Sequence, residues 1–455
     1  MTLPRVTADE AKAFLAANPT VQWIDIVLFD LNGMPRGKRI RPADLQSVVK
    51  SGLMLPASVY VLDPRGNSIA ETGRLWETGD YDIKFHLVAG TLHPVPVGNR
   101  THAQAVMVPE EAYDLAPHGI LANQVARFKK AGQTPVVAVE LEFYVTKRQA
   151  DGSFSLTTPP GVCSDPDQPM TFMFEELDAL GPFIDDVYKI CEVQGLPVDA
   201  VMQESGPGQF EINLKHTDDP VKAALDGLLL KRAIKAAASA HGYEATFMAK
   251  PHHDWTGSGM HVHVSLVDDK GANLFAGDPK APSPSMSPMF RHAVGGLRET
   301  MGDFMAFWAQ SANAYRRYVP ESYVPLTALW GSNNRTVALR IPFGTGAATR
   351  IEHRVAGADA NPYLVVAGIL AGIHHGIAGK IDPGPEAKGN AEELDGPALP
   401  IAWVNALSTF KASPVVREYL GADVQDVYYR LKTTERIGFE RIVTSLDHAW
   451  YAQVA

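Results

Sequence analysis

Four short and mostly apolar stretches carry charged residues spaced two apart, and this pattern constrains the fold more than any other feature. They cover residues 137–144, 209–214, 260–265 and 350–354. Residues i and i+2 of a β-strand point to the same face of a sheet, so each stretch places its polar groups on one face. That face carries Glu, His and Arg rather than the mixed Thr, Ser and Lys of a solvated strand. If these groups converge on one cavity, they require cations for stability and an anionic substrate for the arginines.

Composition favours a soluble two-domain enzyme. The chain has 455 residues, of which 45% are hydrophobic and 20% charged, and this length exceeds what one core usually supports. The net charge of -10 argues against nucleic acid as the main partner. Two cysteines, Cys163 and Cys191, form no disulfide framework and fit a reducing compartment. No apolar signal core is evident at the start of the chain. We therefore expect a cytoplasmic protein.

One segment has nearly the length of a membrane span. Residues 360–379 contain no Asp, Glu, Lys or Arg. Several glycines and the pair His374-His375 favour a buried core helix instead. We expect no membrane partner.

Strand and helix signals predict an α+β protein. Residues 7–17 fit a helix with Thr7 as its cap and Glu10 at the capping-box position. Residues 21–29 fit a strand, and Asn32-Gly33 before residues 36–40 indicates a hairpin. Helical spacing over 108–130 places a domain boundary near residue 115. Longer helices are expected over 172–194 and 220–240.

Paired carboxylates are the strongest chemical signal. Glu140 and Glu142 share one strand face, where they repel each other unless a proton or a cation lies between them. A solvated edge strand would explain them too, but the apolar run 136–139 favours a central strand. Glu204 and Glu211 flank a loop rich in Gly and Pro, which suits close approach of a ligand, although an ordinary turn between a helix and a strand is the favoured interpretation of this stretch taken alone.

Histidines follow a glycine-rich turn. Residues 257–259 read Gly-Ser-Gly, and His261 and His263 then share one strand face. A lone histidine is more often structural than ligating, and two at this spacing after a Gly-Ser-Gly turn strengthen the case for a ligand role. The neighbouring pair His252-His253 could form a separate local metal pair, although exposed loop histidines are the preferred interpretation there.

Arginines accompany both of the last strand-like stretches. Arg350 and Arg354 flank Glu352, and Arg335 and Arg340 lie in the stretch 334–341. Internal salt bridges would explain one such strand, whereas two beside several carboxylates suggest a site that handles phosphate. Mostly oxygen ligands favour Mg²⁺ or Mn²⁺ over zinc. Two or more such ions with arginines are typical of phosphoryl transfer.

The motifs resemble those of the glutamine synthetase family over essentially the whole chain. They are Val-Glu-Leu-Glu-Phe-Tyr (139–144), Gly-Gln-Phe-Glu-Ile-Asn (208–213), Gly-Ser-Gly-Met-His-Val-His (257–263), Asn-Asn-Arg-Thr-Val-Ala-Leu-Arg-Ile-Pro (333–342) and Arg-Val-Ala-Gly-Ala-Asp-Ala-Asn-Pro-Tyr-Leu (354–364), in family order. The phrases Asp-Leu-Asn-Gly (30–33), Arg-Gly-Lys-Arg-Ile (36–40) and Ala-Thr-Phe-Met-Ala-Lys-Pro (245–251) are similar to the bacterial γ-glutamylputrescine (γ-glutamylpolyamine) synthetase branch.

The resemblance implies an N-terminal helix over 1–16, a β-grasp domain over 17–114 and a glutamine synthetase catalytic domain over 115–455, with a curved antiparallel sheet. It implies a dodecamer of two hexameric rings whose sites are shared between neighbouring subunits. One metal ion would be held by Glu142, Glu204 and Glu211, and the other by Glu140, His261 and Glu352.

The remaining site residues are implied in the same way. His263 and Ser265 would lie against ATP, and Arg340 and Arg350 would contact its phosphates. Glutamate or its acyl phosphate would be held by Gly257, Arg317, Arg335 and Arg354.

Departures from the family pattern concern the amine. Tyr323 stands where ammonia-using members carry a flap glutamate, and its ring offers a wall or a cation–π surface for an organic amine. Glu321 lies two residues away and could compensate. Thr256 replaces the usual Asn. Asp63 matches an acidic residue supplied by the neighbouring subunit, and we predict it as the amine-binding group or base.

The predicted activity is ATP-dependent ligation of the γ-carboxylate of L-glutamate to putrescine or another polyamine or alkylamine, through γ-glutamyl phosphate. Arg335, Tyr323 and Asp63 are its predicted catalytic residues, and ATP and two or more Mg²⁺ or Mn²⁺ ions its cofactors. One alternative is an ammonia-using glutamine synthetase, which Tyr323 disfavours. A catalytically silent binding member is more remote, because all six metal ligands are present. The family's adenylylated tyrosine loop is absent; residues 389–396 stand near its place.

Overall fold

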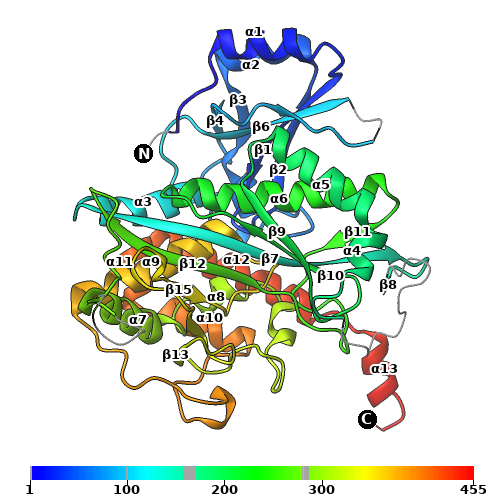
Figure 1. Ribbon diagram of the computed structural model, residues 1–455. Coiled ribbons are helices and arrows are strands. Elements are labelled where there is room, and N and C mark those ends of the chain that lie inside the picture. Colours follow the sequence, from blue (N-terminus) through cyan, green and yellow to red (C-terminus); the bar gives the residue numbers. More distant parts are fainter. Residues whose placement is uncertain (1–2, 99–100, 157–169, 279, 281–285, 455) are drawn as a thin grey trace.

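The computed structural model describes residues 3–98, 101–156, 170–278, 280 and 286–454. Two β-sheets organise these residues (Figure 1). A smaller sheet belongs to the N-terminal part, at the top of the view, and a larger one crosses the middle of the molecule with helices packed around it. The four stretches with alternating charged residues all lie in the larger sheet or in loops at the ends of its strands.

The N-terminal part is a mixed sheet with helices at its outer end. Strand order is β2-β1-β6-β4-β3, and β1 runs parallel to β6 and antiparallel to β2. Thr7 and Glu10 form the predicted capping box of the first helix. The elements are α1 (Ala8–Ala17), β1 (Trp23–Phe29), β2 (Pro35–Ile40), α2 (Leu45–Ser51), β3 (Leu53–Pro56), β4 (Asp82–Leu87), β5 (His93–Pro94) and β6 (His102–Pro109).

The larger sheet is antiparallel except where β13 runs parallel to β14. Its order is β13-β14-β15-β12-β7-β10-β9, and β8 and β11 also pair with β7. The strands are β7 (Gln133–Arg148), β8 (Phe154–Leu156), β9 (Val198–Gln203), β10 (Gln209–Leu214), β11 (Glu244–Thr246), β12 (Met260–Asp268), β13 (Trp330–Ser332), β14 (Leu339–Ile341) and β15 (Ile351–His353). The long β7 is therefore a central strand, as its apolar run predicts.

Helices pack around this sheet and complete the larger part of the chain. They are α3 (Pro117–Lys129), α4 (Glu175–Ala179), α5 (Gly181–Val193), α6 (Pro220–Ala240), α7 (Pro288–Thr300), α8 (Met305–Trp308), α9 (Pro362–Gly379), α10 (Trp403–Ala412), α11 (Pro414–Leu420), α12 (Ala422–Glu440) and α13 (Ser445–Tyr451). The last helix projects from the body at the lower right of Figure 1, and none of its residues is buried.

Helix α9 is the apolar segment with nearly the length of a membrane span. Its most apolar window is 72% buried inside the protein, and α9 packs against α3, α6 and α7. It is a core helix of the folded chain, as its glycines and histidines predict.

Helices α7 and α9 touch through their backbones. A Cβ atom added to Gly296 of α7 would lie 2.2 Å from the carbonyl oxygen of Gly372 in α9. A Cβ atom on Gly376 would lie 2.1 Å from the carbonyl oxygen of His292. Both distances are shorter than any real carbon–oxygen contact, so glycine is required on each side of this crossing.

Three predicted boundaries are wrong. The single helix over 172–194 is broken at Leu180 into α4 and α5, because Pro182 begins a new first turn. Helical structure over 108–130 begins only at Pro117, since Val108 and Pro109 end strand β6. The stretch 334–341 is mostly loop, with only Leu339–Ile341 in a strand. Cys191 is buried, and Cys163 lies outside the described residues.

Candidate active site

Strand register brings the charged residues together. Glu142 of β7 stands opposite Glu211 of β10, and Glu140 stands opposite His261 of β12. One row further along, His263 stands opposite Glu352 of β15, which in turn pairs with Arg340 of β14. Directly opposed residues lie about 5 Å apart at Cβ. The period of two thus gathers residues from five strands on one face.

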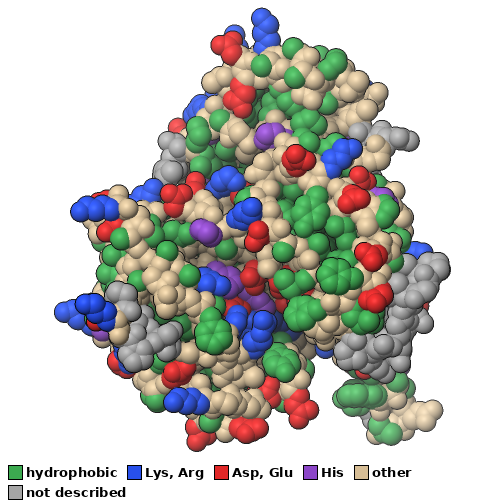
Figure 2. All heavy atoms as spheres, in the orientation of Figure 1, with side chains coloured by type: hydrophobic (Ala, Val, Ile, Leu, Met, Phe, Trp, Pro, Cys, Tyr) green, Lys and Arg blue, Asp and Glu red, His purple; other side chains and the backbone are tan. Residues whose placement is uncertain are grey.

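Figure 2 shows a hollow near the middle of the molecular face, close to β7 and β15 of Figure 1, where acidic, histidine and basic side chains gather. The possible metal ligands on this face form two groups, and within each group the ligand atoms lie within 4.8 Å of one another. One contains Glu140, His261 and Glu352, as predicted; the other contains Glu142, Glu211 and again His261. Imidazole nitrogens of His261 lie 3.5 Å from a Glu140 oxygen and 3.9 Å from a Glu142 oxygen.

Glu204 lies in the loop between β9 and β10. Its backbone N–H donates to the carbonyl oxygen of Gln209, 2.9 Å away, and its carboxyl interacts with the charge of Glu142. The structure places it beside the second group without including it among the converging ligand atoms. Its role as a ligand therefore stays a prediction.

The carboxylates are unequally compensated. Burial, and then the charges of Glu140, Glu142 and Glu204, raise the pKa of Glu211 to about 10. Burial and the charge of Glu142 raise the pKa of Glu204 to about 7. Burial alone would also raise the pKa of Glu140, but hydrogen bonds from His261 and His263 outweigh it and hold the value below the usual range.

This donor set fits divalent cations. Glu211 is only 6% exposed, and the neighbouring groups that shift its pKa upward are other carboxylates. A buried cluster of this kind is stable as anions only with added positive charge. The four converging carboxylates, with Glu204 predicted as a fifth, supply the hard oxygen donors that Mg²⁺ and Mn²⁺ prefer, and His261 adds one imidazole to them.

Arginines border the cluster on the side of β14 and β15. Arg340 and Arg354 donate to separate oxygens of Glu352, at 2.6 and 2.5 Å. Arg350 donates from Nε to Nδ1 of His263, 3.1 Å away. The Nε atoms of Arg340 and Arg354 are buried without a hydrogen-bond partner among the described residues. These two N–H groups lie beside the carboxylates and can each donate a hydrogen bond to a bound anion.

Glycines of the turn before β12 make room for a buried guanidinium. A Cβ atom on Gly257 would lie 2.8 Å from Cγ of Arg317, and one on Gly259 would lie 2.6 Å from its terminal nitrogen. Arg317 donates to the carbonyl oxygen of Val355 at 2.9 Å. Arg317 therefore packs directly against the backbone of this turn. Its contact with a substrate stays a prediction.

The remaining predicted residues differ in position. Ser265 follows His263 on the same face of β12, opposite Val136. Arg335 is exposed in the loop after β13, and its charge lowers the pKa of Glu204 against the larger effect of burial. Neither has a role that the structure tests.

Asp63 lies in the N-terminal part and is not joined to the cluster within one chain. Its two oxygens accept backbone and side-chain hydrogen bonds from Arg65 and Asn67, all between 2.8 and 3.0 Å. Burial opposes ionisation, yet the bonds from Asn67 and Arg65 leave its pKa lowered. A carboxylate engaged in this way is a weak base, so the geometry disfavours that half of its prediction.

Tyr323 also lies apart from the cluster. Its side chain is 67% exposed, and both Tyr323 and Glu321 have left-handed backbone angles, with φ of 56° and 60°. The backbone N–H of Glu321 donates to the carboxylate of Glu392 at 2.9–3.0 Å. This segment is strained and surface-exposed, as functional loops often are.

Sequence reasoning missed the residues that hold the carboxylates in place. The side-chain nitrogen of Gln209 reaches the carbonyl oxygen of Gly257 at 3.1 Å and Glu142 at 3.4 Å. The Tyr144 hydroxyl donates to the carbonyl oxygen of Thr256 at 2.9 Å. Gln209 and Tyr144 stand opposite each other, each two residues from a carboxylate on the same face. That spacing was the available signal.

Comparison with known proteins identifies the family of the chain. Residues 114–451 match the family model described as glutamine synthetase, catalytic domain. The chain is 39% identical over 447 residues to γ-glutamylputrescine synthetase PuuA of Escherichia coli K12, covering 97% of this chain and 94% of that protein. It is 30% identical to a glutamate–isopropylamine ligase of a Pseudomonas species, with 95% of each chain covered. A solved structure described as a GmaS/ADP complex has a TM-score of 0.84 and 25% identity, covering 98% of this chain and 100% of that one.

Fold, cation-binding face and relatives together define an enzyme of the ligase class. The chain belongs to the glutamine synthetase family, whose members use ATP and divalent metal ions. The predicted fold class is thereby confirmed.

Proposed function

We propose that this protein ligates the γ-carboxylate of L-glutamate to an organic amine at the expense of ATP, with putrescine or a similar polyamine as the acceptor. The single observation that carries the proposal is the convergence of Glu140, Glu142, Glu211, His261 and Glu352 beside two partly unpartnered arginines. Such a face suits phosphoryl transfer, where charge neutralisation and positioning provide most of the catalysis. The relatives named as glutamate–amine ligases support an amine acceptor.

The first half-reaction forms an acyl phosphate. The γ-carboxylate oxygen attacks the terminal phosphorus of ATP, ADP leaves, and γ-glutamyl phosphate results. Divalent ions, when bound, would neutralise the phosphate oxygens. Glu142, Glu204 and Glu211 would hold one ion, and Glu140, His261 and Glu352 another. Arg340 and Arg350 would face the nucleotide phosphates with His263 and Ser265 nearby.

The second half-reaction forms the amide. The amine nitrogen attacks the acyl carbon, and phosphate leaves. Gly257, Arg317, Arg335 and Arg354 are proposed to position the acyl phosphate. An alkyl ammonium has a pKa of about 10.4, so it must lose a proton first. Asp63 is proposed to contribute through the turn that it organises rather than as the base, because its pKa is lowered.

Assembly and location are proposed on the family's pattern. A dodecamer of two hexameric rings would give the exposed apolar side chains of Leu446, Trp450 and Tyr451 a partner surface. Consumption of ATP in the first half-reaction and the free thiol of Cys191 suit a cytoplasmic location.

An amine panel tests the proposal. Phosphate release is measured from purified protein with ATP, Mg²⁺ and glutamate, adding ammonia, putrescine, spermidine, ethanolamine or isopropylamine in turn. We expect the highest kcat/KM with a polyamine, and a Glu142→Ala variant as an inactive control with its oligomer intact. A highest rate with ammonia would overturn the amine assignment. Absence of release with every amine would favour a catalytically silent member.

The ammonia-using alternative rests on one observation. Glu321 lies two residues from Tyr323 on the same surface segment, and its carboxylate could serve an ammonium ion. A glutamine synthetase from Pyrococcus horikoshii is 29% identical over 425 residues, below the identity to the organic-amine ligase PuuA. The same panel separates the two acceptors.

A further inference from the structure

A third group of ligand-type side chains lies outside the cluster just described. It consists of the consecutive residues His252, His253 and Asp254, whose candidate ligand atoms lie within 4.8 Å of one another. Among the described residues it is the one such group that includes neither Glu140 nor Glu142. The proposed ligation assigns it no role.

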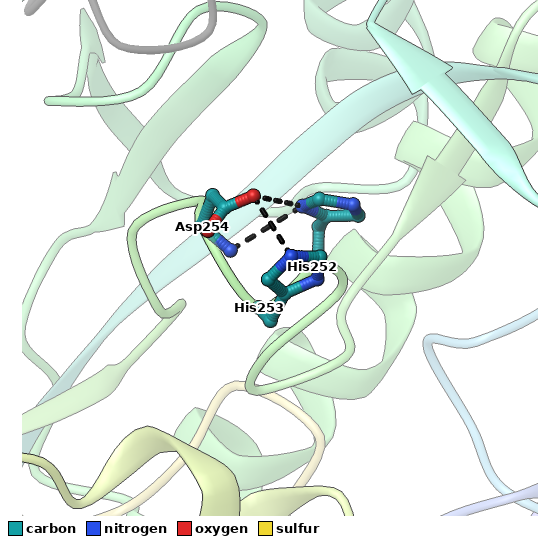
Figure 3. Close-up of side chains that lie close together, drawn as sticks. All are labelled: His252, His253 and Asp254. Atoms are coloured by element: carbon teal, nitrogen blue, oxygen red, sulfur yellow. Dashed lines mark hydrogen bonds and ion pairs between the residues drawn. The ribbon is translucent and has the colours of Figure 1, made fainter. Parts of the chain in front are cut away.

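The two imidazole rings approach one carboxylate oxygen of Asp254 (Figure 3). Oδ2 of Asp254 lies 2.9 Å from Nε2 of His253 and 3.7 Å from Nδ1 of His252. The two imidazole rings lie against each other with centroids 4.1 Å apart. Nδ1 of His252 also accepts the Asp254 backbone N–H at 3.3 Å, which places the proton of a neutral ring on Nε2. The lone pair at Nδ1 is therefore engaged by this N–H, and a cation bound at Nδ1 would replace that long hydrogen bond.

The loop that carries the group is held at its base. The N–H of Ser258 donates to the carbonyl oxygen of Ala249 at 2.9 Å and closes the loop. Lys250 and Asn313 exchange two hydrogen bonds of 3.0 and 2.7 Å. The loop's three donors are thus presented by a supported backbone, which lowers the entropy cost of gathering them around a ligand.

Trp255 anchors the exposed tip to the interior. Trp255 is 7% exposed. Its ring packs against the ring of Tyr144, with centroids 5.3 Å apart, and against the ring of His252, with centroids 5.2 Å apart. His253 and Asp254, by contrast, have side chains 80% and 57% exposed. The tip is therefore accessible to solvent while one of its donors is fixed against a buried aromatic.

We propose that His252, His253 and Asp254 form a binding site for a borderline divalent ion such as Zn²⁺, distinct from the carboxylate centre. Two imidazoles and one carboxylate are donors that suit Zn²⁺, and positions left open would be filled by water. The carboxylate centre has one imidazole and five carboxylates, which suits Mg²⁺ or Mn²⁺. One chain thus holds two cation sites of different chemical preference.

Zn²⁺ titration of the full-length protein tests the site. Calorimetry is performed with Mg²⁺ in large excess, comparing the wild-type protein with a His252→Asn/His253→Asn double variant. We expect the wild type to bind one more Zn²⁺ per chain than the double variant. His216→Asn, at an exposed histidine outside the group, is the matched control and should bind as the wild type does.

Asp254→Asn provides an independent check, because it keeps the loop's size while removing the charge. Its Zn²⁺ affinity at this site should fall by at least the roughly 10- to 100-fold that loss of an outer-shell partner costs. Equal stoichiometry and affinity in the wild type and the double variant would overturn the proposal. So would unchanged affinity in Asp254→Asn.

Discussion

Two buried carboxylates of this protein, Asp63 and Glu211, differ in which neighbouring groups compensate their negative charge. Asp63 in the N-terminal part is surrounded by donors from Arg65 and Asn67, and its pKa is lowered. Glu211 in the large sheet is surrounded by other carboxylates, and burial with their charges raises its pKa to about 10. The negative charge of Asp63 is compensated within its own turn. The charge of Glu211 and its neighbouring carboxylates is compensated only when cations bind, so uncompensated buried charge identifies the place where external ligands act.

The sharpest way to break this comparison is Glu211→Gln. The amide keeps the shape but removes a proposed metal ligand, and we expect turnover to fall by at least about 100-fold. The metal-free protein should become more stable by roughly 1–3 kcal/mol near pH 7.5, because the folded wild-type protein must keep this carboxyl protonated while the unfolded chain ionises it, and the amide removes that difference. Phosphate release and denaturant unfolding measure the two effects. Unchanged turnover would contradict the ligand assignment.

Asp63→Asn should act in the opposite direction on stability. It replaces an acceptor of charge-assisted hydrogen bonds with an amide, at a cost of about 1.5–3 kcal/mol in the free energy of unfolding. Stabilisation of the variant by Mg²⁺ should be retained, since the residue lies outside the cluster. Asp382→Asn, at an exposed acid paired with Arg291, is the control and should cost far less. A stabilised Asp63→Asn protein would refute the comparison.

Tyr323→Glu tests whether acceptor choice is separate from the phosphate centre. A carboxylate at this exposed position supplies an anchor for ammonium, and we expect the ratio of kcat/KM for ammonia over putrescine to rise about 10-fold. Tyr323→Phe keeps the ring and should leave the ratio near the wild-type value. Equal ratios in all three proteins would show that acceptor choice lies elsewhere.

The smallest expected effect is the change in stability over a single pH unit. Glu204 and Glu211 have folded pKa values raised to about 7 and about 10, so the folded metal-free protein binds more protons than the unfolded chain above pH 4.5. Stability should therefore fall as pH rises from about 5 towards 10, by at most about 1.4 kcal/mol per pH unit for each group. Mg²⁺ should flatten this slope. Unfolding curves that rise with pH in the metal-free protein would contradict the raised values.

The sequence predicted the centre well because strand geometry is local. The period of two assigned Glu140, Glu142, His261 and His263 to one face, and register then brought in Glu211. It also predicted α6 to the residue and the capping box of α1.

Other features depend on contacts between distant segments. No local pattern could show that Arg317 lies beneath Gly257 and Gly259, because that contact joins segments far apart in the chain. The engagement of both Glu352 oxygens by Arg340 and Arg354 likewise follows from the pairing of β14 with β15. The break at Leu180 had a visible cause in Pro182, which the helical pattern around it obscured.

The glycine crossing of α7 and α9 has a consequence for the order of folding. Residues 301–361 lie between these helices, and they include Arg317, Arg335, Arg340, Arg350 and Arg354. When α9 docks against Gly296, the ends of this segment are brought together, and the entropy cost of closing the loop is incurred in that single step. Because the two backbones fit only in one register, that step also sets the frame in which the arginines approach β7 and β12. The final placement of the anion-binding arginines therefore follows the docking of these two helices.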